Sequence, residues 1–156
     1  MKLILKQKLL SFLDSFDIYD ESGNVVFTVK SQLALGHYMN VYDSLGNEVG
    51  TIKQELLHFL PTFQIYVNGL RMGSIKKEFT FFIPKFTLDM QGWTVEGDLL
   101  EWDYTVYDGR RAVMTVSKRV IALTDTYELN IYDDKDTVPG LIVALAIDAE
   151  KCSRSN

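Results

Sequence analysis

A short motif of an aliphatic residue, a tyrosine and an aspartate recurs along the chain, within stretches where apolar and polar residues alternate. Its full copies are Ile18-Tyr19-Asp20, Val41-Tyr42-Asp43, Val106-Tyr107-Asp108 and Ile131-Tyr132-Asp133. Two degenerate copies are Ile65-Tyr66-Val67 and Leu88-Asp89-Met90. Successive copies start 23, 24, 23, 18 and 25 residues apart. A nearly constant period of this length predicts a series of repeated supersecondary units.

A turn sequence follows each of the first five copies. These turns lie at 20–24, 43–47, 68–69, 91–92 and 108–109. Glycine and asparagine tolerate positive φ, and aspartate or asparagine side chains bond the turn backbone, so each turn predicts a hairpin. A second apolar strand follows each turn. Several of these strands end on an aliphatic residue and a lysine, at Val29-Lys30, Ile52-Lys53, Ile75-Lys76 and Val116-Ser117-Lys118.

The alternation of apolar and polar residues supports strands rather than helices. In residues 63–67 the apolar side chains of Phe63, Ile65 and Val67 share one face, and residues 126–132 repeat the pattern. A period of two with one polar face is typical of half-buried antiparallel strands. Five hairpins, a strand at 3–8 and a strand at 126–132 make about twelve. Because barrel closure removes the free edges of so large a sheet, we predict a closed antiparallel barrel.

The C-terminal part of the chain predicts a helix over about 137–150. Its apolar residues cover nearly all sides of a helix, which is typical of a buried one. The predicted core residues are Leu141, Ile142, Val143, Leu145 and Ile147, followed by Asp148. A barrel of more than about eight strands has a lumen that its own side chains do not fill. We therefore predict that this helix threads the barrel, with Asp148 near the mouth in a structural pair with a lysine or arginine.

Composition places the chain among single globular domains. It has 156 residues, 47% of them hydrophobic and 24% charged, and a net charge of −5. We expect one domain over 1–150 and a polar tail over 151–156. The negative balance disfavours a nucleic-acid binder, which carries a broad basic face. The longest apolar run, 138–147, is about half of the roughly 20 residues that a membrane span needs, so no transmembrane segment is expected.

The N-terminus and the cysteine content indicate the compartment. Lys6, Gln7 and Lys8 interrupt the first apolar run, whereas a secretory signal needs an unbroken one of about 7–15 residues. The single cysteine, Cys152, excludes an internal disulfide and fits a reducing compartment. We therefore expect a cytoplasmic protein.

Sequence motifs for catalysis are missing. The chain has no Gly-x-Ser-x-Gly elbow, P-loop or dinucleotide-binding glycine motif. His37 and His58 are isolated, and a metal site needs converging ligands. We expect no cofactor, no metal and no catalytic residue, and so not an enzyme.

Basic and aromatic residues are the remaining candidates for function. Lys76, Arg110, Arg111 and Lys118 are candidate ligands for a phosphate or headgroup, which several such residues would bind together. Ordinary solvated surface charge is the alternative. The aromatic segment 79–86, and with it 59–61, is expected to cap one end of the barrel, because aromatic side chains bury large areas. A membrane-interface or partner-binding role for 79–86 is the alternative.

Several segments together resemble those of a known family. They are 6–8, 14–20, 46–49, 59–61, 125–128 and 144–149, with sequences KQK, DSFDIYD, GNEV, FLP, DTYE and ALAIDA. Along essentially its whole length the chain resembles the LURP-one-related (LOR, YxjI-like) proteins, which share the Tubby C-terminal-domain-like fold with phospholipid scramblases. The resemblance implies a twelve-stranded barrel around a central hydrophobic helix. Tubby domains bind phosphoinositide headgroups and scramblases act on phospholipids, but none of their functional residues has a match here.

Two functions of different classes therefore stay open. The first is a non-enzymatic domain of this type that binds lipid headgroups or a membrane surface. The alternative is a protein-interaction or regulatory scaffold with no lipid role. A plugged lumen disfavours a small-ligand carrier, and the missing motifs disfavour a hydrolase.

Overall fold

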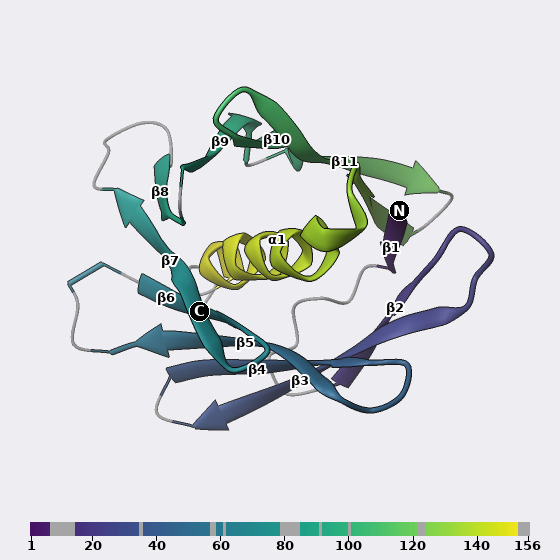
Figure 1. The fold of residues 1–156 in the computed structure, drawn as a ribbon, viewed down its shortest axis with the longest axis horizontal. Helices are drawn as coiled ribbons and strands as arrows, with labels where there is room; N and C mark the ends of the chain where they lie inside the picture. The colour runs from purple at the N-terminus through teal and green to yellow at the C-terminus, as the bar shows by residue number, and fades with distance from the viewer. Residues whose placement is uncertain are drawn as a thin grey trace.

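The chain folds into one curled antiparallel sheet around one helix (Figure 1). The computed structural model describes residues 1–6, 15–34, 36–56, 59–60, 62–78, 85–90, 92–99, 101–121 and 124–152. The strands are β1 Lys2–Lys6, β2 Ser15–Tyr19, β3 Val25–Ala34, β4 Gly36–Asp43, β5 Glu48–Glu55, β6 Thr62–Val67, β7 Leu70–Glu78, β8 Lys85–Asp89, β9 Trp93–Asp98, β10 Asp103–Asp108, β11 Arg111–Ile121 and β12 Thr124–Ile131. A 3₁₀ turn, η1 Asp134–Asp136, leads into the helix α1 Thr137–Cys152.

The spatial order of the strands follows the chain, and the first strand pairs with the last. The order is β8-β7-β6-β5-β4-β3-β2-β1-β12-β11-β10-β9. The predicted twelve-stranded antiparallel barrel is thus confirmed, with one difference. The hydrogen-bonded ladder stops between β8 and β9, so the barrel is nearly closed rather than closed. The chain turns sharply where Trp93 N donates to Met90 O at 2.8 Å, and β9 then pairs with β10 instead of β8.

Two hairpin turns are built in the same way, as their sequences predict. In the first, Asp20 Oδ1 accepts hydrogen bonds from the backbone N–H of Ser22 and Asn24, and Asp20 Oδ2 accepts from Asn24 Nδ2. In the second, Asp43 binds Leu45 and Asn47 in the same pattern. The glycine of each turn has a φ of 84° or 83°, a conformation that side chains disfavour.

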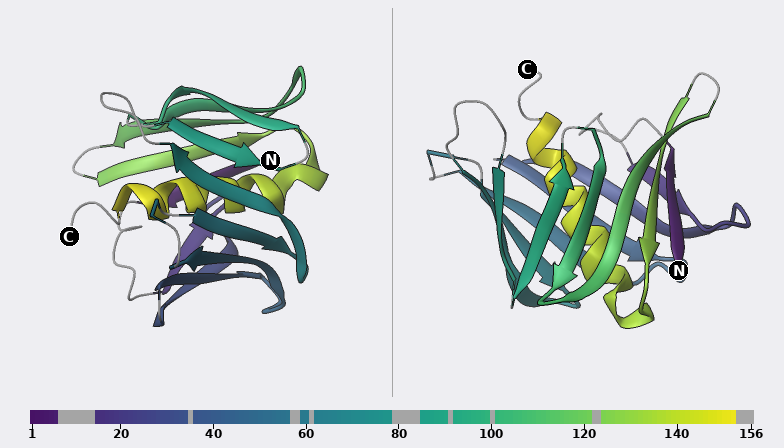
Figure 2. Two further views of the ribbon diagram at one scale, coloured as in Figure 1. Left: turned by 90° about the vertical axis from the view of Figure 1, so that its left-hand side faces the viewer. Right: turned by 90° about the horizontal axis from the view of Figure 1, so that it is seen from above.

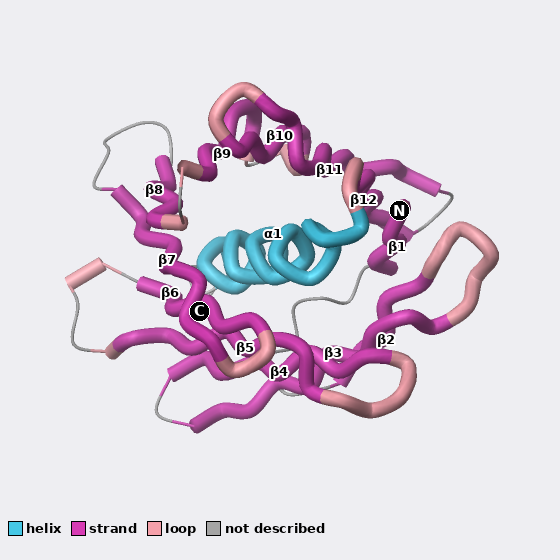
Figure 3. Tube along the Cα trace, in the orientation of Figure 1, coloured by secondary structure: helices cyan, strands magenta, loops and turns pink. Residues whose placement is uncertain are grey.

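The helix α1 runs along the barrel axis and supplies much of the core (Figures 1 and 2). Residues 141–147 and Ala149 are each at most 2% exposed. The helix packs against β5, β6 and β7 on one side and β11 and β12 on the other. It lies inside a single layer of strands (Figure 3). No helix in the described ranges has the length and apolarity needed to cross a bilayer.

The two predicted aromatic caps have different outcomes. Residues 79–84 lie outside the described residues, and Phe86 packs partly buried against the core. In the other segment, Phe59 is 94% exposed, so the expectation that it caps the barrel is wrong. The helix already fills the lumen, and an aromatic side chain at Phe59 is not required there.

Candidate functional site

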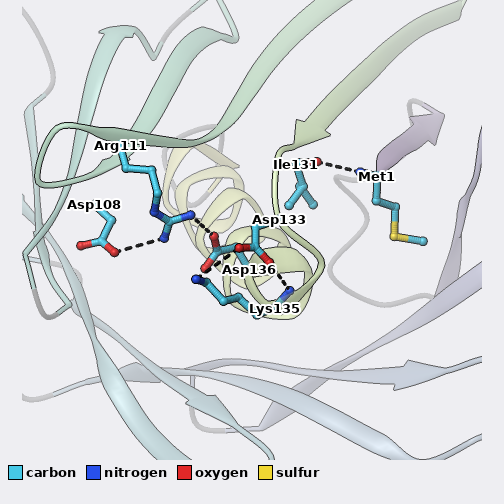
Figure 4. A network of polar contacts seen from close by, with 7 residues as sticks. All are labelled: Met1, Asp108, Arg111, Ile131, Asp133, Lys135 and Asp136. Carbon is cyan, nitrogen blue, oxygen red and sulfur yellow. Dashed lines mark hydrogen bonds and ion pairs between the residues drawn. The ribbon is translucent and has the colours of Figure 1, made fainter.

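An ion pair between the buried Asp136 and the partly exposed Arg111 joins the start of the helix to the barrel wall (Figure 4). Arg111 Nη1 donates to Asp136 Oδ2 at 2.5 Å, and its Nη2 donates to Asp108 Oδ2 at 3.1 Å. Asp136 is 5% exposed. The two carboxylates hold the pKa of the Arg111 guanidinium above its usual value. The geometry therefore assigns Arg111 a structural role, because a buried carboxylate is stable only when it is paired.

A second buried polar group lies towards the other end of the helix. Tyr104, on β10, is 2% exposed, and its hydroxyl has no hydrogen-bond partner among the described residues. Burial, together with the nearby charge of Asp148, raises the pKa of the Tyr104 phenol. Asp148 is itself 5% exposed. Its pairing with a lysine or arginine stays a prediction.

The four predicted basic residues do not come together as one group. Arg110 and Arg111 are adjacent at the turn between β10 and β11, and Lys118 lies seven residues further along β11. That separation is about 23 Å along an extended strand. Lys76 lies on β7, and in the sheet order the strands β6 to β1 and β12 lie between β7 and β11. Lys76, Arg110 and Lys118 are exposed, so their role as ligands stays a prediction.

The outer face of β3–β6 gathers a different set of basic and aromatic residues, which we call the Tyr–Lys wall: Lys30, Tyr38, Tyr42, Lys53 and Tyr66. The strand register brings this set together. Lys30 pairs across to Asn40 on β4, Asn40 to Thr51 on β5, and Thr51 to Tyr66 on β6. In the next row, Tyr38 pairs with Lys53.

Short polar side chains form the floor of the wall. Asn40 and Thr51 lie on the outer face, yet they are only 5% and 9% exposed. Longer side chains on the neighbouring strands therefore cover them. The Lys30 ammonium lies 4.9 Å from the centre of the Tyr42 ring, a cation–π contact.

Two shallow hollows open onto this wall. One, of about 390 Å³, is lined by Val25, Thr28, Lys30, Tyr42, Asp43, Ser44 and Gly46. The other, of about 250 Å³, is lined by Tyr38, Thr51, Lys53, Tyr66 and Gly69. Each hollow thus contains one lysine and at least one tyrosine, which can offer a cation, a hydroxyl and an aromatic face to a small ligand.

Neither lysine of the wall forms an ion pair with a described residue, whereas several other cations do. Lys2 pairs with Glu21, Arg119 with Glu128 and Lys135 with Asp133, at 2.9, 3.0 and 3.2 Å. Sequence analysis missed the wall, although its signal is present. The sequence repeat places a tyrosine on β4 and on β6 and a lysine on β3 and on β5, but only the strand register shows that these side chains share one face.

Comparisons with known proteins agree with this architecture. The sequence profile of the LURP-one-related family matches residues 1–148. The chain belongs to the LURP-one-related family. It is 32% identical over 149 residues to the uncharacterised protein YxjI of Bacillus subtilis (strain 168), covering 95% of this chain and 92% of that protein. The resemblance predicted from the sequence motifs is therefore confirmed.

A solved structure shows the same fold in a plant protein. This chain matches an X-ray structure of a protein from Arabidopsis thaliana with a TM-score of 0.57 and 19% sequence identity. The match covers 94% of this chain and 90% of the plant protein. At that identity the likeness shows the shared fold alone. Within the described ranges of this LURP-one-related chain, no cluster of three or more histidine, cysteine or acidic side chains could hold a metal ion.

Proposed function

We propose that this LURP-one-related chain is a non-enzymatic, cytoplasmic binding domain that attaches to anionic lipid headgroups through the outer surface of its barrel. The observation that carries the proposal is the filled lumen. Because residues 141–147 of α1 fill the interior and are each at most 2% exposed, we expect a ligand to bind outside. The outer surface offers the Tyr–Lys wall, whose lysines lie beside tyrosines and form no ion pair with any described residue.

The chemistry of the wall suits a membrane surface. Tyrosine is enriched at membrane interfaces, where its ring and its hydroxyl are both satisfied. A lysine near an anionic surface contributes about 1 kcal/mol. Leu45 and Leu70, which are 85% and 71% exposed, adjoin lining residues of the two hollows, at Ser44, Gly46 and Gly69. The domain would thus present cations, tyrosines and exposed leucines on one side.

The predicted basic residues have unequal parts in this proposal. Lys76, Arg110 and Lys118 lie outside the wall and contribute only a long-range positive potential, which salt screens. Arg111 contributes less, because Asp136 and Asp108 engage its guanidinium.

Vesicle sedimentation tests the proposal. The protein is mixed with vesicles of phosphatidylcholine alone or of phosphatidylcholine with phosphatidylglycerol, at low and at high salt. We expect retention on the anionic vesicles at low salt, release at high salt because exposed charges are screened, and no retention on neutral vesicles. No retention on anionic vesicles at low salt would overturn it.

A protein-interaction scaffold is the second candidate. Exposed apolar side chains favour it: Leu45, Leu56, Phe59 and Leu70 are all more than half exposed. This role predicts a defined partner that the wild-type chain retains and a Leu45→Ser/Leu70→Ser variant loses. The same variant would leave salt-sensitive vesicle binding largely intact if that binding is electrostatic.

A further inference from the structure

We propose that the Tyr–Lys wall is a defined site for a phosphorylated polyol, with Lys30 and Lys53 on the phosphate and Tyr38 and Tyr66 against the polyol. This chemistry is shared by phosphoglycerol-type lipid headgroups and by soluble polyol phosphates. The inference rests on the proposed function and goes further, because it names the residues and the ligand group.

The spacing of Lys30 and Lys53 allows both lysines to reach one phosphate. Lys30 is in the same cross-strand row as Thr51, two strands away, and Lys53 lies two residues along β5 from Thr51. Strand spacing and rise place the two Cα atoms about 12 Å apart. A phosphate above Asn40 and Thr51 lies within reach of both flexible four-carbon stems.

The two tyrosines provide aromatic surfaces for the polyol. Tyr38 and Tyr66 stand on β4 and β6, on either side of Thr51 and Lys53, and all four line the smaller hollow. A polyol places C–H groups against an aromatic face and hydroxyls against polar atoms. The tyrosine rings supply such faces, and Thr51 supplies a hydroxyl below them. The volume of about 250 Å³ accommodates a small headgroup.

The carboxylates that border the wall are each engaged by the protein. Asp43 accepts hydrogen bonds from Leu45 N, Asn47 N and Asn47 Nδ2. Glu48 accepts from the Thr51 hydroxyl at 2.8 Å, and Glu55 accepts from Gln64 Nε2 at 2.8 Å. These donors hold the acidic groups in place, whereas the ammonium groups of Lys30 and Lys53 form no ion pair with any described residue.

Two charge-matched variants test the site. Lys30→Gln/Lys53→Gln removes two positive charges from the wall, and Lys76→Gln/Arg110→Gln removes two exposed ones elsewhere. All four side chains are exposed, so both variants are expected to melt as the wild type does. At about 1 kcal/mol for each lysine near an anionic surface, we expect the wall variant to bind phosphatidylglycerol vesicles about 30-fold more weakly. The control variant changes the affinity much less.

Two further measurements distinguish recognition of the headgroup from attraction to its charge. They also show whether the ligand is a lipid or a soluble molecule. Phosphatidylserine vesicles of equal charge density should bind the wild type more weakly than phosphatidylglycerol vesicles. Glycerol 3-phosphate and inorganic phosphate are titrated against the Tyr38 and Tyr66 ring resonances. Shifts with glycerol 3-phosphate that the wall variant loses support a soluble ligand. Preference for phosphatidylglycerol vesicles without such shifts supports a lipid headgroup.

A tyrosine pair provides a test that leaves the charge unchanged. Tyr66→Leu is expected to reduce the preference for phosphatidylglycerol, and Tyr132→Leu, at a 60% exposed tyrosine away from the wall, is expected to leave it intact. If the wild type binds anionic vesicles and the wall variant binds as well as the control, the site is wrong and the proposed function stands. If the wild type binds neither vesicles nor soluble phosphate, both are overturned.

Discussion

Ile142 occupies the space that a side chain at Gly50 would need. A Cβ atom built on Gly50 would lie 2.1 Å from Ile142 Cδ1, far inside van der Waals contact. The missing side chain on β5 thus lets the helix pack directly against the strand backbone.

This contact predicts a specific rescue. Gly50→Ala is expected to lower the free energy of unfolding by about 1–3 kcal/mol, because it overpacks the core. Ile142→Val removes the Cδ1 methyl that the new side chain meets. The double variant should therefore be more stable than the sum of the two single effects, as measured by urea unfolding. Strict additivity would contradict the contact.

The ion pair at the helix start predicts a large loss of stability. Arg111→Met leaves the Asp136 carboxylate buried without its charged partner, which is expected to cost about 3 kcal/mol. Arg110→Met, at the exposed neighbouring position, is the control and should change the unfolding free energy by less than about 0.5 kcal/mol. Arg111→Met/Asp136→Asn should regain part of the loss. Equal effects at Arg110 and Arg111 would contradict the structural role.

The two matched turns predict a pH dependence. Hydrogen bonds from Asn24 and Asn47 hold the pKa values of Asp20 and Asp43 below the usual value of 3.8. A lowered pKa in the folded state contributes stability above the unfolded-state pKa, and this is lost as the pH falls through the folded-state pKa. Asp20→Asn/Asp43→Asn should therefore lose less stability than the wild type on acidification below about pH 4. Glu96→Gln, an exposed carboxylate outside these turns, is the control. A double variant with the wild-type pH profile would contradict the assignment.

The buried helix predicts intolerance to charge. Val143→Asp places a carboxylate at a position with 0% exposure and is expected to abolish cooperative folding, because an unpaired buried charge is too costly. Leu145→Ala, which leaves a cavity, should cost about 2–5 kcal/mol and stay measurable. Leu70→Asp, at a 71% exposed leucine, serves as the control in thermal melts. An unchanged melting temperature for Val143→Asp would refute the packing.

Sequence reasoning reached the fold because its signals are local. Turn residues such as Asp43 and the alternation around Ile65 act within a few positions. A helix that is apolar on all sides indicates by its sequence alone that it is buried. The open join between β8 and β9 depends instead on how the chain leaves Met90, which no local pattern shows.

The candidate site was harder to predict, because it depends on cross-strand register. Lys30 and Tyr66 are 36 positions apart in the sequence and share a row only through Asn40 and Thr51. Arg111 was a candidate ligand as one of four basic residues, and that role stays a prediction. Its partner Asp136, 25 positions away, became visible only in three dimensions.

The pairing of the first strand with the last sets the order in which the domain can form during synthesis. β1 finds its partner β12 only when residues 124–131 have been made, and the helix that fills the lumen follows afterwards. Until then, the apolar inner faces of the earlier strands have nothing to enclose. A ribosome-bound chain that stops before residue 137 therefore lacks its core rather than a dispensable end.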